Sequence, residues 1–335
     1  MTSPTVDGYR TTGTLASRGW RLSPAAQGTL RVWALALTLL VLYFLLSPRS
    51  ANFTSINLLL QNCLPLAWVA GGQMAVLIVG QIDLSVGGVV SLATAIAATR
   101  MGPSALDAVV VSLVTISIGA AFGVLNGFLV AYRRMSSFIV TIATWSIIDG
   151  AALVVLPSAG GSVPSVFTSV VNMISPLSFG AIALIGSLLL WVWVRSTAGF
   201  LRLRAVGSGA EKAHWAGVAE RRTVVAAYAF SGLAAASAGL VLAGVTSSGD
   251  PNIGTSYILN SLAAAVIGGV SLLGGSGSFA GVLGGAMVLT IVNNVVFALG
   301  LTAYLEPAIV GGILAIAVFT TGLGSHRRLA GGVGT

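Results

Sequence analysis

Long apolar runs, interrupted by few charges, constrain this sequence more than any other feature. Only 7% of the 335 residues are charged and 56% are hydrophobic, whereas soluble domains carry about 25% charged residues. A charge at the centre of a membrane helix costs roughly 2.5–3.5 kcal/mol on insertion scales, which accounts for the scarcity of charges here. The composition excludes an ordinary soluble protein and predicts an all-α integral membrane protein.

The apolar runs have the length that a membrane helix needs, which is roughly 20 residues. They predict about ten transmembrane helices, some of them broken by glycines. The predicted spans are 31–47, 58–79, 84–100, 106–132, 137–157, 177–195, 223–246, 257–272, 278–299 and 303–321. We expect a cytoplasmic N-terminal tail over residues 1–30, a membrane domain over 31–322 and a cytoplasmic C-terminal tail over 323–335.

The distribution of charge predicts how the chain is oriented. The net charge is +8, but the basic residues occur in short clusters between apolar runs and not along a polar stripe of the kind that binds nucleic acid. With both termini inside, Arg133, Arg134 and the segment 196–222 fall on the cytoplasmic side, and Asp107 and Asp250 fall outside. This arrangement follows the positive-inside rule.

Several chemistries are excluded by the residues present. A phosphate-binding loop needs Gly directly before Lys and Ser or Thr after it, and in "GSGAEKA" at 207–213 these places hold Glu211 and Ala213. The single Cys63 and the distant His214 and His326 offer no set of metal ligands. We therefore expect no catalytic residue, no metal and no cofactor in this chain.

The stretch "GQIDLSVGG" at 80–88 places Asp83 between two apolar runs. It reads as a break between two helices, in which Asp83 caps the second helix and the paired glycines allow close neighbours. Irregular backbone within a membrane persists only where it is buried in protein or lines a cavity. Two interpretations of Asp83 stay open, a structural cap and a direct role in solute passage or gating.

A second break is predicted within residues 249–278. Tyr257 and Asn260 offer hydrogen-bonding groups inside its apolar run, and Gly268 and Gly269 interrupt its far end. Interrupted segments in the two halves of a chain indicate a transport path.

Glycines also recur at every fourth position in two apolar runs, where they allow helices to approach closely. They are Gly119, Gly123 and Gly127, and Gly277, Gly281 and Gly285. The two stripes fit an inverted repeat of the transporter type, but glycine stripes also occur in other helical bundles. Both interpretations stay open.

The basic segment 196–222 contains "AEKAHWAG", which predicts a short helix ended by Gly217. Taken alone, this helix is either a basic segment that contacts anionic lipid or a docking element for a cytoplasmic partner.

Four segments together resemble a known family. They are "GQIDLSVGG", "LNGFLVAYRRMSSFIVTIATWSI" at 125–147, "AVGSGAEKAHWAGV" at 205–218 and "AAAVIGGVSLLGGSGSFAGVLGGAMV" at 263–288. In this order, over about residues 35–322, the chain resembles the permease subunits of bacterial ABC importers of the ribose/galactose/xylose type. The resemblance implies the transmembrane translocation subunit of an ATP-driven importer for a monosaccharide or related polyol.

The resemblance also implies partners and a location. In the bacterial cytoplasmic (inner) membrane, a second permease copy forms a homodimer with this chain within membrane lipid. A cytoplasmic ATPase subunit carries ATP and Mg, and an extracytoplasmic sugar-binding protein delivers the solute. Hydrolysis is thus expected in a partner, not in this chain.

Candidate residues follow from these motifs. For the translocation pathway and its helix breaks they are Asp83, Ser85, Gly87, Gly88, Asn126, Asp149, Tyr257, Asn260, Gly268 and Gly269. For the loop that couples to the ATPase they are Gly207, Glu211, Lys212, Ala213, His214 and Gly217.

The chain departs from the family pattern at several of these places. Asp149 stands where an arginine is usual, Ile258 replaces a glutamate, Asn260 replaces an aspartate and Ser276 replaces an arginine. The changes predict a retuned pathway or an unusual substrate. An alternative function is an ion-coupled secondary transporter or channel for a small polar solute. It would depend on Asp83 and Asp149 and would not need the 205–218 loop.

Overall fold

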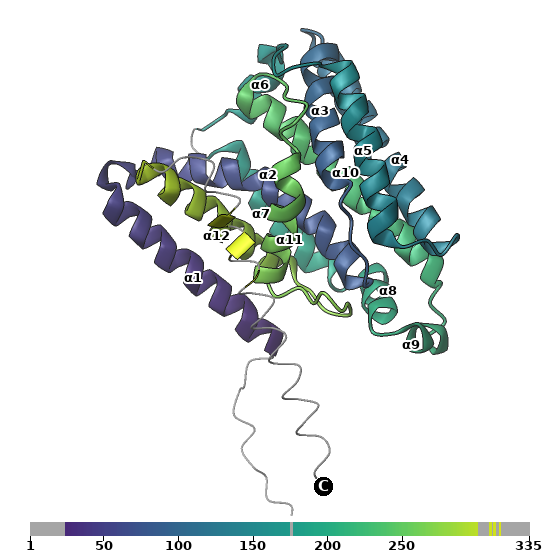
Figure 1. Ribbon diagram of the computed structural model, residues 1–335. Helices are drawn as coiled ribbons and strands as arrows, with labels where there is room; N and C mark the ends of the chain where they lie inside the picture. The colour runs from purple at the N-terminus through teal and green to yellow at the C-terminus, as the bar shows by residue number, and fades with distance from the viewer. Residues whose placement is uncertain (1–23, 175–176, 301–307, 310, 313–314, 316–335) are drawn as a thin grey trace, which may run out of the picture.

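The computed structural model describes residues 24–174, 177–300, 308, 309, 311, 312 and 315, and within them the chain is helical with no strand. Figure 1 shows the helices as a bundle around α2 and α10. The elements are α1 (Pro24–Leu46), the 3-10 turn η1 (Pro48–Ser50), α2 (Phe53–Ile78), α3 (Val86–Arg100), α4 (Ala105–Ala131), α5 (Ser137–Val155), α6 (Ser165–Val171), α7 (Phe179–Val194), α8 (Ala198–Gly207), α9 (Ala210–Trp215), α10 (Glu220–Thr246), α11 (Thr255–Ile267) and α12 (Phe279–Ala298).

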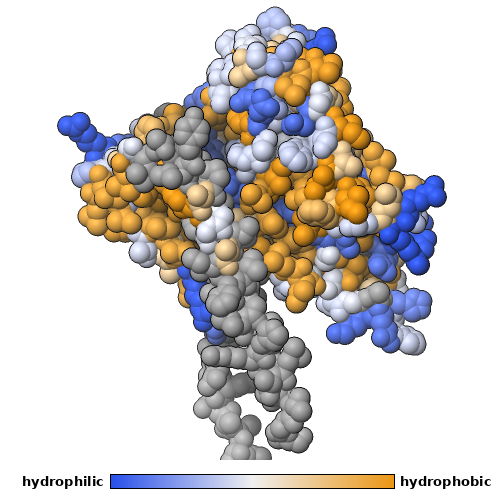
Figure 2. All heavy atoms as spheres, viewed as in Figure 1, coloured by the Kyte–Doolittle hydropathy of each residue, from blue (hydrophilic) through white to orange (hydrophobic). Residues whose placement is uncertain are grey.

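Burial divides the long helices into a core and a periphery. Buried residues make up 56%, 67% and 72% of the apolar stretches of α2, α10 and α12, but only 11% of that of α1 and 22% of that of α4. The exposed side chains of α1 and α4 are mostly apolar, as suits contact with lipid. Figure 2 shows this apolar surface over the middle of one face, with hydrophilic residues gathered toward its ends, including the end at α9.

The span count agrees only in part with the sequence prediction. Among the described residues, six helices are long and apolar enough to cross a membrane, or seven if α7 and α8, which are bent by 77°, form one span. The predicted spans 84–100 and 257–272 correspond to α3 and α11, which have only 15 and 13 residues because glycine-containing breaks flank them. Nearly all of the predicted span 303–321 lies outside the described residues. A count of ten is therefore not confirmed.

Both predicted tails fall largely outside the described residues. α1 already begins at Pro24, within the segment expected to be tail. Between the long helices lie the short helix α6 and, within the segment 196–222, the helix α8, which the sequence did not predict. The helix expected from "AEKAHWAG" is confirmed as α9, and Gly217 follows it with a φ of +65°.

α1 packs along α12 at the edge of the bundle (Figure 1). The indole Nε1 of Trp33 donates a hydrogen bond of 3.0 Å to the carbonyl oxygen of Ala280. Gly284 leaves room for this contact, because a Cβ there would lie 2.9 Å from Val32.

The first glycine stripe is the surface on which α4 packs against α10. A Cβ on Gly123 would overlap the carbonyl of Tyr228, and a Cβ on Gly127 would lie 2.7 Å from the backbone of Val225. In the second stripe, Gly281 and Gly285 pack α12 on the end of α11, since a Cβ on either would overlap the carbonyl of Gly268 or Ala264, whereas Gly277 precedes α12 and faces Ile78 of α2. Both stripes are thus helix contacts, as close approach of membrane helices requires.

Gly123→Ala should destabilise the folded permease by about 1–3 kcal/mol, because the added methyl group forces α4 away from α10. The matched control is Gly186→Ala in α7, where a Cβ meets nothing within 4 Å. The control should be neutral or slightly stabilising, since alanine is the better helix former. Reversible unfolding of the two variants in detergent measures the difference, and equal stabilities would contradict the close contact.

Candidate functional site: a buried polar network at a helix break

The first predicted break is present between α2 and α3. α2 ends at Ile78, α3 begins at Val86, and Gly80 between them has a φ of +78°, which favours glycine. Asp83 lies within this break and is 1% exposed, so the break faces the bundle as expected.

The Asp83 carboxylate accepts three hydrogen bonds. Its Oδ1 accepts from the backbone N–H of Ser85 (3.0 Å) and from the Ser85 hydroxyl (2.6 Å), and its Oδ2 accepts from the hydroxyl of Ser231 on α10 (2.8 Å). The prediction that Asp83 caps α3 is wrong in its details. The N-cap residue is Ser85, and Asp83 binds the N–H of that residue instead of the N–H groups of the first helical turn. It thereby fixes the turn before the helix.

The network continues into α4 and α5. Asn126 Nδ2 donates to the Ser85 hydroxyl (2.9 Å), and the Thr144 hydroxyl donates to Asn126 Oδ1 (2.6 Å). Asn126 is fully buried and Thr144 is 6% exposed. Together, Asp83, Ser85, Asn126, Thr144 and Ser231 form what we call the Asp83 network, which joins the break to three helices.

Sequence reasoning identified Asp83, Ser85 and Asn126 but missed Thr144 and Ser231. The hydrogen bonds to the Asp83 carboxylate all come from neutral donors, which are two serine hydroxyls and one backbone N–H group. The Tyr228 hydroxyl of α10 donates a hydrogen bond of 3.0 Å to the carbonyl of Ile82, next to Asp83, and so holds the break against α10. A satisfied buried network of this kind favours one geometry of the break.

The second predicted break, residues 249–278, contains the helix α11 between two irregular segments, and the segment between α10 and α11 touches the first break. A Cβ on Gly254 would overlap the carbonyl of Gly87, and a Cβ on Gly87 would lie 2.5 Å from Ile258. The N–H of Gly254 also donates to the Ser91 hydroxyl at 3.0 Å. The two glycine-containing breaks predicted from the sequence are therefore in direct contact.

The other pathway candidates lie apart from the Asp83 network. Tyr257 and Asn260 are half-buried on α11. Asp149 is half-buried on α5, and its Oδ1 has no hydrogen-bond partner within the described part of the chain. Gly88 packs on α5, since a Cβ on it would lie 3.1 Å from Trp145 and from Ile148.

Gly268 and Gly269 form the far end of the second break. Gly268 packs on Gly281 of α12, and Gly269 has a φ of +84° where α11 ends.

α8 meets both breaks at one point, which we call the α8 junction and define by Ile78, Arg204, Gly207 and Gly275. Gly275 N–H donates to the Ile78 carbonyl (2.9 Å), and Arg204 Nε donates to the Gly275 carbonyl (3.3 Å). A Cβ on Gly207 would overlap the Ile78 carbonyl. The end of α2 and the loop after α11 are thus both held against the last turn of α8.

α9 has one buried anchor and an exposed outer face. Ala213 is fully buried in a cluster with residues of α2, α4, α5, α8 and α10. Glu211, Lys212 and His214 are exposed, and Trp215 is 81% exposed. The cluster that holds Ala213 includes Tyr228, so α9 is connected to the Asp83 network through packed side chains.

A helical bundle with apolar outer faces, two helix breaks in contact and an anchored, exposed loop helix has the features of a multi-span membrane permease. The family model described as "Branched-chain amino acid transport system / permease component" matches residues 56–318, and the chain belongs to this family.

Individual relatives agree with this assignment. The chain is 32% identical over 289 residues, 83% of each chain, to a probable ABC transporter permease protein of Sinorhizobium fredii. It is 29% identical over 330 residues to the ribose import permease protein of Escherichia coli K12, covering 95% of this chain and 98% of that one. It is 32% identical over 310 residues to the galactose/methyl galactoside import permease protein of Haemophilus influenzae, covering 85% and 92%.

No solved structure matches the chain. The predicted membership among the permeases of ABC importers is confirmed by the family model and the relatives, which are named as permease proteins.

Proposed function

We propose that this chain is the translocation subunit of an ATP-driven importer for a monosaccharide or related polyol in the bacterial cytoplasmic membrane. The observation that carries the proposal is similarity over nearly the whole chain to permeases named for ribose and galactose import. The exposed helix α9 supports an ATP-driven mechanism over the secondary transporter or channel, because a self-sufficient carrier has no need of a docking helix.

The proposed membrane topology has about ten spans with both termini in the cytoplasm, counting α3, α11 and the segment 303–321 as spans. The orientation is supported by the charges at one end of the bundle. There, Arg221 at the start of α10 lies 5.4 Å from the Tyr132 ring at the end of α4, near Arg133 and the basic helix α8. The inverted repeat remains a proposal supported by the two glycine stripes.

The proposed partners are a cytoplasmic ATPase subunit that binds ATP and Mg, an extracytoplasmic sugar-binding protein and a second permease copy. The ATPase would receive α9, with Glu211, Lys212 and His214 on the docking face and Gly207 and Gly217 at the ends of the loop. Ala213 would transmit its movement to the bundle.

The Asp83 network would hold the pathway in one of two conformations. ATP binding and hydrolysis in the partner would shift the equilibrium between these two conformations by changing the contacts of α8 and α9 with the two breaks. In this proposal Asp83, Ser85 and Asn126 act as structural elements of the gate, and Tyr257, Asn260 and Asp149 are candidate contacts of the solute.

The test is purification of the full-length permease from its native membrane in mild detergent, followed by mass spectrometry and by uptake assays of the complex in proteoliposomes. We expect a near-stoichiometric protein with a phosphate-binding loop, and ATP-dependent uptake of labelled ribose or galactose. Replacement of residues 208–217 by a Gly/Ser linker should release that protein.

The matched control is Arg133→Gln/Arg134→Gln, which removes charge from the same end of the bundle and leaves α9 intact. It should retain the ATPase. Absence of an ATPase under all nucleotide conditions would contradict the coupling role of α9 and favour the secondary transporter. If the ATPase is retained and the complex takes up neither sugar but a solute of another class, only the proposed substrate is contradicted.

A further inference from the structure

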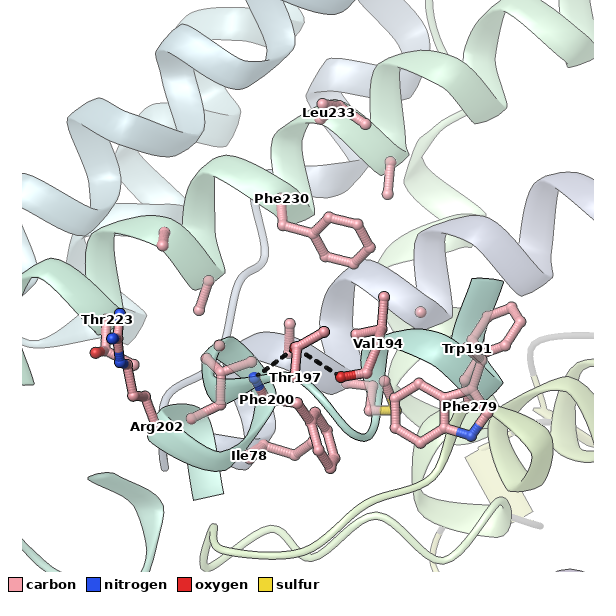
Figure 3. A pocket seen from close by; sticks show the side chains of 18 of the residues that line it. Ile78, Trp191, Val194, Thr197, Phe200, Arg202, Thr223, Phe230, Leu233 and Phe279 are labelled. Carbon is pink, nitrogen blue, oxygen red and sulfur yellow. Dashed lines mark hydrogen bonds between the residues drawn. The ribbon is translucent and has the colours of Figure 1, made fainter. Parts of the chain in front are cut away.

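A large cavity lies between α2, α7, α8 and α10, away from the Asp83 network. Its volume is about 890 Å³, at the upper end of the roughly 300–1,000 Å³ that is typical of ligand sites. Figure 3 shows that the bend between α7 and α8 forms its floor, with Thr197 near the bend, and that Phe230 of α10 points into it from the opposite side.

Most of the wall is apolar. Trp191 and Val194 of α7 and Phe279 of α12 line one end, and Phe230 and Leu233 of α10 line the side (Figure 3). Phe230 and Leu233 are 48% and 40% exposed, although both are large hydrophobic residues. A sugar in this cavity would leave its hydroxyl groups without partners along such walls, at a cost for each group. The cavity is therefore suited to a chain of methylene groups.

The other end of the cavity is cationic. Arg202 of α8 and Arg222 of α10 both line the cavity, and no Asp or Glu is present among its described lining residues. Figure 3 shows Arg202 beside Thr223, the residue that follows Arg222 in α10. Neither guanidinium makes a hydrogen bond or ion pair within the described chain, whereas Arg204, two residues after Arg202, donates a hydrogen bond to the Gly275 carbonyl. Two uncompensated arginines at the mouth of an apolar cavity attract an anion with an apolar tail.

We propose that this cavity binds an anionic phospholipid, with the phosphate between Arg202 and Arg222 and an acyl chain along α10. Arginine forms paired hydrogen bonds to phosphate oxygens, and basic pockets between membrane helices on the cytoplasmic side bind anionic lipid headgroups. The inference rests on the proposed orientation, in which the end with α8 and α9 faces the cytoplasm. The occupant joins α8 to α10, the two helices that flank α9.

The experiment is native mass spectrometry of the full-length permease with added phosphatidylglycerol or phosphatidylcholine. We expect phosphatidylglycerol to be retained at least tenfold more tightly than phosphatidylcholine. Arg202→Gln/Arg222→Gln should remove this preference, and Arg133→Gln/Arg134→Gln, at the same end but outside the cavity, should keep it. Ala226→Trp, which fills the cavity and changes no charge, should also reduce retention at least tenfold.

Three results would overturn the proposal. Both headgroups carry a phosphate, so equal retention of the two lipids would exclude a role for the net negative charge of the lipid. An equal loss of the preference in the Arg133→Gln/Arg134→Gln control would attribute the effect to surface charge. If Ala226→Trp leaves lipid retention intact and separates a permease dimer, the occupant is a second copy. None of these readouts depends on transport, so they leave the importer proposal standing.

Discussion

Asp83→Ala is expected to destabilise the folded permease by about 2–5 kcal/mol. The substitution leaves the hydroxyls of Ser85 and Ser231 and the backbone N–H of Ser85 without their acceptor. The bond from Ser231 joins Asp83 to α10, and such interhelical bonds in membranes are worth about 0.6 kcal/mol on average and up to about 1.7 kcal/mol. A buried donor left without its acceptor costs about 1–3 kcal/mol. Unfolding of the purified permease in detergent measures the change.

Asp83→Asn separates structure from charge at the same position. The amide keeps an acceptor for Ser85, and the Ser231 hydroxyl can reverse to accept from the new NH₂ group. We expect most of the stability and the ATP-driven uptake to be retained. The control Asp107→Ala makes the larger change at an exposed carboxylate, bound to Ser104, and should have a much smaller effect on stability.

A different outcome for these variants would change the interpretation. If Asp83→Asn folds normally but loses all uptake, the charge of Asp83 takes part in transport, and an ion-coupled secondary transporter is favoured over the ATP-driven importer. If Asp83→Ala is as stable as the control, the Asp83 network does not hold the break.

Gly207→Val is expected to lower ATP-driven uptake at least tenfold while the ATPase subunit stays bound. The valine side chain would overlap the Ile78 carbonyl and the Gly275 N–H that donates to this carbonyl, and so would displace α8 from the end of α2. A tenfold loss corresponds to about 1.4 kcal/mol, which lies within the roughly 1–3 kcal/mol that forced overpacking usually costs. α9 begins after Gly207 and keeps its exposed face, so docking should survive.

The measurement combines uptake in proteoliposomes with co-purification of the ATPase. Gly186→Val in α7 is the control, because it introduces the same side chain where a Cβ meets nothing within 4 Å. Loss of both uptake and ATPase binding in Gly207→Val would assign the α8 junction to docking. Normal uptake in Gly207→Val would show that the α8 junction takes no part in coupling ATP hydrolysis to transport.

The breaks and the loop helix could be predicted from the sequence because local chemistry determines them. Glycines next to polar residues in an apolar run mark a break, and the six residues of α9 end before a glycine with positive φ. α8 was not predicted. Its apolar positions Phe200, Leu203 and Val206 have helical spacing, but they are mixed with arginines in a segment that reads as a polar loop.

The partners of Asp83 were only partly predictable. Thr144 gives no signal in the sequence, because a hydroxyl in an apolar helix can bond to its own backbone, as Thr144 also does to Val140 (2.9 Å). Its contact with Asn126 depends on how α4 and α5 pack. The cavity between Arg202 and Arg222 depends in the same way on the 77° bend between α7 and α8, which no local pattern specifies.

The packing of α1 along α12 has a consequence for biosynthesis. Trp33 and its acceptor Ala280 are 247 residues apart, so at about 5–20 residues per second the ribosome needs roughly 12–50 s to supply the partner of α1. During that interval α1, the least buried long helix, can remain inserted in lipid on its own, because its surface is apolar on most sides. α1, which is synthesised before the other described helices, is thus among the last of them to dock, and truncation of the chain before α12 should leave α1 free for capture by insertion factors or proteases.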